Sequence, residues 1–162
     1  MRDLTIVSGG QTGADRAALD FALEFGLTHD GWCPSDRRAE DGAIDERYGL
    51  TETPSHRYDQ RTRWNVRDSD ATVVFSMAHE VSGGTALTLA IADRQGKPYL
   101  HLSSEAVSAD GRDAAQELLD FLAVHHVGRL NVAGPRASQE PEIAAFVREV
   151  LVDALDRNER KE

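Results

Sequence analysis

The residues best suited to chemistry in this chain lie in three Gly-rich loops. The loops cover residues 9–13, 82–85 and 134–138, and each joins a short apolar run to a helical pattern. In a parallel sheet, such loops all lie at the carboxyl edge of the strands, where ligands bind. We therefore predict that the three loops line one pocket.

The first loop, Gly9-Gly10-Gln11-Thr12-Gly13, is typical of an anion site. A Gly-rich turn at a helix N-terminus brings backbone N–H groups and the positive end of the helix dipole together. Glycine also lacks the Cβ that would block close approach to the backbone. The loop matches neither the dinucleotide motif G-x-G-x-x-G nor the Walker motif. The alternative is a tight turn without a ligand.

No set of residues predicts a nucleophile or a metal site. Ser8 and Ser76 end predicted strands, but no base is visible in the sequence beside either of them. The six histidines lack the spacing of metal ligands, which must converge in threes or fours. We therefore assign no catalytic residue and no metal ligand.

The single cysteine, Cys33, cannot form an internal disulfide, which is typical of a reducing compartment.

The order of elements predicts an α/β fold, a Rossmann-like three-layer sandwich with a mostly parallel central sheet. We expect strands at 4–8, 28–33, 71–76, 98–102 and 129–133, with the first strand in the middle of the sheet. We expect helices at 14–26, 61–69, 84–95, 112–126 and 139–156, with Ser138 capping the last. Residues 1–156 should form a single domain, followed by a charged tail at 157–162.

Residues 34–60 form a long polar segment after the second predicted strand. Loops longer than about 15 residues are uncommon in compact domains and are often functional. We interpret this segment as a flap beside the pocket, and a disordered excursion is the alternative.

Composition excludes several partners. The net charge of −10 disfavours binding of extended nucleic acid. The sequence holds no apolar run long enough for a membrane helix and no secretory signal before the first strand, so we expect a cytoplasmic protein.

The helix expected at 84–95 is apolar on nearly every side, which favours a homo-oligomer, either a dimer or a tetramer.

A set of motifs carries a family resemblance: Gly9–Asp15, Gly31–Pro34, Arg38–Gly42, Tyr48–Glu52, Arg61–Asp70, Gly83–Thr85, Gly96–Pro98 and Asn131–Arg136. Together they resemble the molybdenum cofactor carrier family over residues 4–155. The family is similar to the Rossmann-like "lonely guy" phosphoribohydrolases. The resemblance implies a cytoplasmic homo-oligomer that holds molybdenum cofactor, a pterin with a phosphate and a dithiolene-bound molybdenum.

One position departs from the related phosphoribohydrolases. Their motif P-G-G-x-G-T-x-x-E ends in a catalytic Glu, and the matching stretch here places Thr88 at that position. A hydroxyl cannot act as the carboxylate base, which argues against sugar–base cleavage by that mechanism. Glu40, Asp41 or Glu52 could supply a carboxylate instead, so an enzymatic function remains an alternative.

Two functions follow from these observations. The first is binding, storage and carriage of molybdenum cofactor (molybdopterin) or molybdate, with molybdoenzymes as recipients. The phosphate or oxo groups of the cofactor would bind backbone amides and Arg38, Arg63 or Arg136. The N–H groups of its pterin would bind Glu40 and Asp41. The second is a nucleotide-binding or nucleotide-processing enzyme that uses the same loops. A module that serves only protein interactions is a third, weaker hypothesis.

The residues expected to bind the ligand are Gly9, Gly10, Gln11, Thr12, Gly13, Arg38, Glu40, Asp41, Ser82, Gly83, Gly84, Thr85, Gly134 and Arg136.

Overall fold

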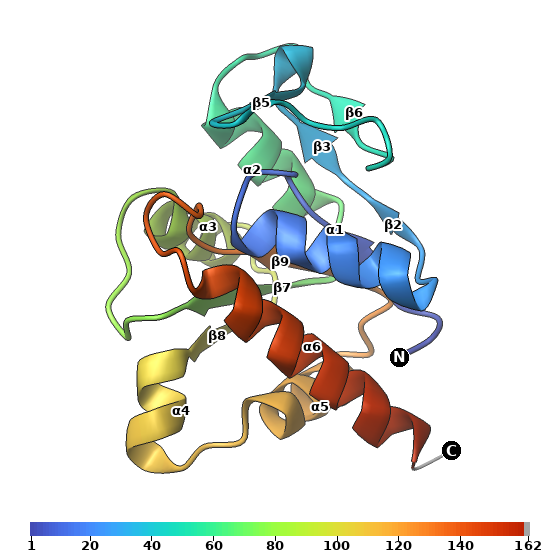
Figure 1. The fold of residues 1–162 in the computed structure, drawn as a ribbon, viewed down its shortest axis with the longest axis vertical. Coiled ribbons are helices and arrows are strands. Elements are labelled where there is room, and N and C mark those ends of the chain that lie inside the picture. Colours follow the sequence, from blue (N-terminus) through green and yellow to red (C-terminus); the bar gives the residue numbers. More distant parts are fainter. Residues whose placement is uncertain (161–162) are drawn as a thin grey trace.

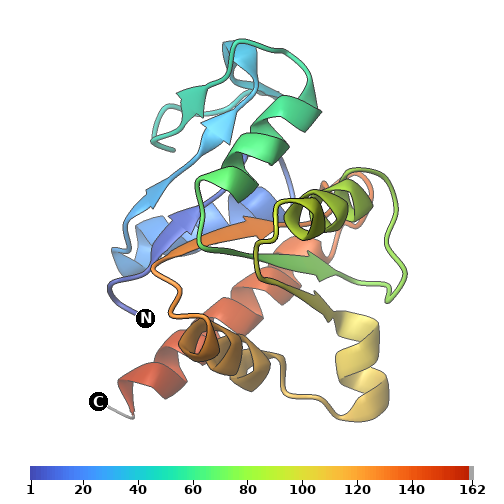
Figure 2. The same ribbon diagram turned by 180° about the vertical axis from the view of Figure 1, so that it is seen from behind.

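The chain forms a Rossmann-like α/β sandwich around a five-stranded parallel sheet (Figures 1 and 2). The structure is a computed structural model that describes residues 1–160. The sheet strands are β1 (Thr5–Val7), β2 (His29–Asp30), β7 (Ala71–Ser76), β8 (Tyr99–Ser103) and β9 (Arg129–Ala133). Their spatial order is β2-β1-β9-β7-β8, and every neighbouring pair is parallel.

The first strand is not the middle of the sheet, so that prediction is wrong. β1 lies between β2 and β9, and β9 occupies the middle position. Strand order depends on where each crossover returns to the sheet, and the sequence pattern predicts that strands exist but not how they are ordered. The bounds predicted for the strands at 71–76 and 129–133 agree with β7 and β9.

Helices cover both faces of the sheet. α1 (Ala14–Phe25), α5 (Ala114–Val124) and α6 (Ile143–Glu159) share the main core with one face, where fully buried side chains include Phe21, Leu118 and Leu151. α2 (Tyr58–Arg67) and α3 (Gly83–Arg94) pack against each other and contribute a smaller cluster, Val66, Ile91 and Ala92. Figure 2 shows α2 and α3 in front of the sheet, on the side opposite to α1 and α6.

Residues 31–57, which we call the small lobe, are ordered rather than a bare loop. They contain β3 (Trp32–Cys33), a 3-10 turn η1 (Ser35–Arg37), β4 (Arg38–Ala39), β5 (Gly42–Ala43) and β6 (Thr51–Glu52). β3 pairs with β6, and β4 forms a hairpin with β5. The lobe has its own apolar core, in which Ile44, Tyr48 and Leu50 pack with Cys33 and with Leu19 of α1.

Gly31 explains why the strand expected at 28–33 divides into β2 and β3. Its φ of +145° is reserved for glycine, and a Cβ there would lie 2.0 Å from the carbonyl oxygen of Ser8. The chain therefore leaves the main sheet at Gly31 and enters the small lobe.

Several helix predictions differ from the structure. α2 spans Tyr58–Arg67 rather than 61–69, and α5 spans Ala114–Val124 rather than 112–126. α4 (Ser104–Asp110) was not expected, and the hydroxyl of Ser103 caps it by accepting from the Ala106 N–H. α6 begins at Ile143 rather than 139, so Ser138 is not its cap. α6 also continues to Glu159, into the segment expected as a tail, whereas residues 161 and 162 lie outside the described part of the chain.

Candidate functional site

The three Gly-rich loops converge on one cleft of about 250 Å³ at the carboxyl edge of the sheet. This confirms the prediction that they share a pocket. The first loop contributes Gln11, the second Gly84 and Thr85, and the third Gly134 and Arg136. The other residues that line it are Asp15, Tyr58, Asp59, Arg61, Leu87, Thr88, Ala133 and Gln139. We call this space the cleft.

The first loop is held in place by glycine geometry. Gly10 and Gly13 adopt φ of +73° and +82°, which side chains rarely allow. A Cβ at Gly13 would lie 2.4 Å from the carbonyl oxygen of Pro135, so the first and third loops touch through backbone. The Ala14 N–H donates to that same oxygen at 3.2 Å. These contacts fix the start of α1 against the loop after β9.

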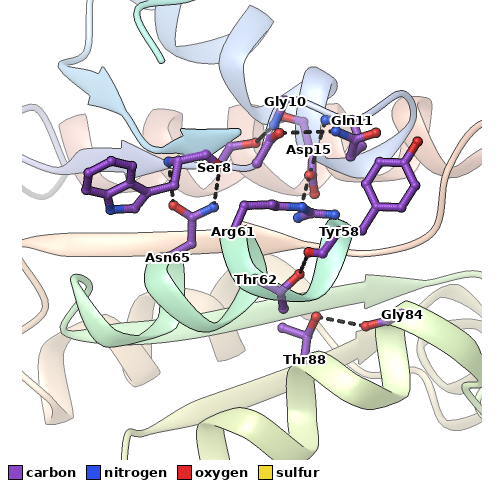
Figure 3. A network of polar contacts seen from close by, with 12 residues as sticks. Ser8, Gly10, Gln11, Asp15, Tyr58, Arg61, Thr62, Asn65, Gly84 and Thr88 are labelled. Atoms are coloured by element: carbon purple, nitrogen blue, oxygen red, sulfur yellow. Dashed lines mark hydrogen bonds and ion pairs between the residues drawn. The ribbon is translucent and has the colours of Figure 1, made fainter. Parts of the chain in front are cut away.

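The buried carboxylate of Asp15 bonds to the backbone of the first loop (Figure 3). Asp15 is 3% exposed, and its Oδ2 accepts from the Gln11 N–H and lies 3.3 Å from the Nη1 of Arg61. Burial raises the pKa of this carboxyl, and Arg61 and backbone N–H groups oppose that rise. The positive end of α1 therefore already faces an anion that belongs to the protein.

The N-terminus of α3 faces the cleft without such an occupant. The side chain of its N-cap, Ser82, accepts no capping hydrogen bond, and the first intrahelical bond runs from the Ala86 N–H to the Ser82 carbonyl. The first amides of a helix lack intrahelical partners, so they can bind an anion. At Gly84 a Cβ would meet no atom within 4 Å, which shows open space beside this turn.

Tyr58 supplies the aromatic surface of the cleft. It is the first residue of α2, and two guanidinium groups lie near its ring. The Arg38 Cζ is 4.7 Å from the ring centroid, and the Arg136 Cζ is 5.4 Å from it. Arg136 lines the cleft, whereas Arg38 does not and donates to the carbonyl of His56 instead. A planar ring entering the cleft would therefore meet an aromatic surface next to positive charge.

The two acids expected to bind ring N–H groups have partners within the protein. Glu40 accepts from the hydroxyl of Thr12, and from the backbone N–H and hydroxyl of Ser138 at 3.2 and 2.5 Å. These bonds, led by the one from the Ser138 hydroxyl, lower the pKa of Glu40. Asp41 pairs with Arg16 at 2.7 Å. Glu40 thus fastens the β4–β5 hairpin to the first and third loops, and Asp41 fastens it to α1. Neither acid is among the residues that line the cleft.

The arginine expected at 63 lies elsewhere. Arg63 pairs with Asp59 one helical turn away, at 2.9 Å, and its side chain is 51% exposed. Arg61, two positions earlier, is the arginine of α2 that lines the cleft. The sequence pattern could have identified Arg61 only if the rotation of α2 about its own axis, relative to the sheet, were known.

The predicted binding residues thus divide into two groups. Gln11, Gly84, Thr85, Gly134 and Arg136 line the cleft, and Ser82 lines an adjoining pocket of about 290 Å³ that shares Thr85 and Gln139 with it. The rest support the loops or the hairpin without lining either space: Gly9, Gly10, Thr12, Gly13, Arg38, Glu40, Asp41 and Gly83. Sequence reasoning missed Asp15, Tyr58, Arg61 and Gln139 as lining residues. Of these, Asp15 and Arg61 lie within the quoted motifs Gly9–Asp15 and Arg61–Asp70, which were the available signal.

Thr88, which the sequence aligns with the Glu of the phosphoribohydrolase motif, lines the cleft. It is 4% exposed, and its hydroxyl donates to the Gly84 carbonyl at 2.9 Å, as Figure 3 shows. That bond is internal to α3, so the hydroxyl proton is already engaged.

Ser76, which lines the adjoining pocket, forms a close pair with His101 that the sequence did not reveal. The Ser76 Oγ lies 2.7 Å from the His101 Nε2 and 2.6 Å from the Ala78 carbonyl oxygen. A carbonyl only accepts, so the single hydroxyl proton goes to Ala78 and the imidazole N–H donates to Ser76. This arrangement closes the turn after β7. It does not activate Ser76 as a nucleophile, because the base carries the proton that it would need to remove.

The described residues, 1–160, contain no helix long and apolar enough to cross a membrane. In the same range, no three His, Cys, Asp or Glu side chains converge as a metal site.

Comparison with known proteins places this geometry in a family. A family model described as the circularly permutated YpsA SLOG family matches residues 6–155. The chain is also similar to the crystal structure of a protein from Syntrophus aciditrophicus that is named, provisionally, a molybdenum carrier protein. The two are 44% identical and superpose with a TM-score of 0.89, over 93% of this chain and 94% of that chain. No curated protein matches the chain.

Proposed function

We propose a carrier function for this chain, which belongs to the circularly permutated YpsA SLOG family. The protein binds and carries a molybdenum-containing small molecule, namely molybdenum cofactor. The cargo lies in the cleft, with its phosphate at the N-terminus of α3 and its pterin against Tyr58. The name of the Syntrophus protein supports a molybdenum-related cargo.

The observation that carries this proposal is the N-terminus of α3, where the Ser82 side chain makes no capping hydrogen bond, beside two arginines. Arg61 and Arg136 line the same cleft as Gly84 and Thr85. Guanidinium groups and helix N-terminal amides are both donors suited to phosphate or oxo groups. The corresponding turn of α1 is already filled by Asp15, so we assign the anion to α3.

A carrier fits the lining residues better than a hydrolase. Thr88 stands in place of the motif Glu, and its proton is engaged by the Gly84 carbonyl. The buried carboxylate in the cleft, Asp15, is held by Arg61 and by the Gln11 N–H rather than directed at a ligand. Holding and releasing a cargo needs donors in place but no general base.

We further propose a cytoplasmic homo-oligomer that delivers its cargo to molybdoenzymes. The support for an oligomer is α3, whose Leu87 is 38% exposed while its buried face consists of Thr85, Thr88, Ile91 and Ala92. Light scattering at micromolar concentration tests this, and a monomer would contradict it.

The proposed cargo is tested by what the protein holds after purification from cells that make molybdenum cofactor. We expect molybdenum by mass spectrometry and an equal amount of oxidised pterin by fluorescence. The loaded protein should also restore activity to a cofactor-free molybdoenzyme. Gly84→Ala is the matched control that keeps the backbone donors, and Gly84→Asp should purify with less cargo than either wild type or Gly84→Ala. A bound nucleotide, or a free base released from an added nucleotide, would contradict the carrier.

A further inference from the structure

The side-chain amide of Gln11 has a fixed orientation in the cleft. Its Nε2 donates to the Arg38 carbonyl at 2.9 Å and lies 3.5 Å from the Gly9 carbonyl oxygen. Rotating the amide by half a turn would bring its oxygen against two carbonyl oxygens. The hydrogen-bond network therefore assigns the NH₂ to that side and the Oε1 to the other.

Two polar atoms of residues that line the cleft have no hydrogen-bond partner. Among residues 1–160, the Gln11 Oε1 and the Arg61 Nε are buried atoms without a hydrogen bond. Gln11 is 2% exposed, and both residues line the cleft. Buried polar atoms in folded proteins nearly always have partners, and an exception calls for a ligand or an ordered water.

The two atoms require different chemistry from a ligand. The Gln11 Oε1 only accepts, so its partner must carry an N–H or O–H. The Arg61 Nε only donates, so its partner must be an acceptor. A bare tetrahedral oxyanion such as molybdate presents acceptors alone. It can satisfy Arg61, but it places like charge density against the amide oxygen of Gln11.

We infer that the cleft selects a planar heterocycle whose edge carries an N–H beside a carbonyl or ring-nitrogen acceptor. The Gln11 Oε1 reads the N–H, the Arg61 Nε reads the acceptor, and Tyr58 stacks on the ring. This inference rests on the proposed function for the place of the anion, and it makes the cargo the whole pterin rather than free molybdate. Both atoms are shielded from water, so this recognition requires a lining side chain to move aside when the ring binds.

Isothermal titration with three probes tests the selection. The probes are neopterin monophosphate, ribose phosphate, which keeps the phosphate monoester without the ring, and molybdate. Wild type should bind neopterin monophosphate at least about tenfold more tightly than either other probe, the difference expected for one good buried hydrogen bond. In Gln11→Leu this preference should fall about tenfold, while the affinity for ribose phosphate should stay within about twofold.

A control separates recognition from a loosened lobe, because Gln11 also anchors the Arg38 carbonyl. Arg37 donates to backbone carbonyls of residues 44, 45, 48 and 50 within the small lobe and does not line the cleft. Arg37→Ala should lower the affinities for both phosphate probes by the same factor and leave their ratio unchanged. If Gln11→Leu does not fold, a pterin phosphate methylated on its lactam nitrogen replaces the variant, and wild type should lose the ring preference for it.

Two results would overturn the inference. One is molybdate binding to wild type as tightly as neopterin monophosphate. The other is a Gln11→Leu variant whose affinities for both phosphate probes fall together, as expected if water satisfies the amide. A protein that prefers the ring but carries no molybdenum would contradict the proposed function and leave this inference standing. Preference for a nucleotide monophosphate over the pterin would do the same.

Discussion

Replacing Gly84 by Asp places a negative charge at the N-terminus of α3. Gly84 is the second residue of that helix, lines the cleft, and has no atom within 4 Å of an added Cβ. The substitution should therefore fold without a clash. Gly84→Ala is its matched control, because it adds the same Cβ without the charge. The pair isolates electrostatics from sterics at the point where we place the cargo's phosphate.

The expected loss of affinity follows from Coulomb's law. Two unit charges about 6 Å apart, at an effective dielectric constant of about 20, repel by about 2.8 kcal/mol. Screening at physiological salt, with a Debye length of about 8 Å, reduces this to about 1.4 kcal/mol. Gly84→Asp should therefore weaken binding of a phosphate-bearing ligand about tenfold, and more at low salt. Gly84→Ala should leave affinity within about twofold.

Stability should change in the opposite direction. Alanine in place of a helical glycine adds about 0.5–1 kcal/mol, and an acidic residue in the first turn adds about 0.3–1 kcal/mol through the helix dipole. For a chain of this size each kcal/mol raises Tm by about 2–4 °C. Both variants should thus melt at a higher temperature than wild type, although only one loses affinity.

The assay is titration of neopterin monophosphate at low and at physiological salt, with melting curves of the same samples. Equal loss of affinity in both variants would show that bulk, not charge, matters at Gly84. Full affinity of Gly84→Asp at low salt would refute the placement of the anion at α3.

Three further predictions follow from the geometry. Gly10→Val should destabilise the fold by about 2–5 kcal/mol in urea melts, because Gly10 has φ of +73° and a Cβ there would lie 2.5 Å from the Leu50 Cδ1. Arg136→Ala should weaken binding of a phosphate-bearing ligand by about 1.5–3 kcal/mol in titrations, and Arg136→Lys should recover part of it. Asp68 has its pKa lowered to about 2 by Arg67 and by the indole N–H of Trp32, so it stabilises the fold above its ordinary pKa of 3.8 and loses that effect as pH falls towards 2. Asp68→Asn should flatten the acid limb of stability, as followed by tryptophan fluorescence, and an unchanged limb would contradict this assignment.

Much of the fold could be predicted from local patterns. The run Ala71–Ser76 is wholly buried in a parallel strand, and such strands appear as continuous apolar segments in the sequence. Likewise β9 and the first and third loops follow from apolar runs that lead into glycine, whereas the second loop begins at Ser82, after β7 has ended at Ser76. Their convergence on one cleft follows from the parallel sheet alone, since the loops all lie at its carboxyl edge.

Other features depend on contacts that no local pattern encodes. Residues 34–60 were predicted as a flap from their length and polarity. The order within the small lobe was missed because its strands are only two residues long and its core includes Leu19 of α1. The choice of Arg61 over Arg63 depends on the rotation of α2 over the sheet. The Ser76–His101 pair depends on the register of β7 and β8, where Val74 lies opposite His101.

The difference between the first and second loops carries the functional argument. Both are Gly-rich turns at one sheet edge, and each leads into a helix whose N-terminus attracts an anion. The second residue of α1 is Asp15, and its buried carboxylate takes the anion's place with Arg61 as counter-charge. The second residue of α3 is Gly84, and that turn is open to the cleft. Gly84→Asp would therefore recreate at α3 the arrangement that α1 already has, an acidic residue at the second helical position. If α3 binds the cargo's phosphate, this single residue decides which of two similar helix termini is free to bind a ligand.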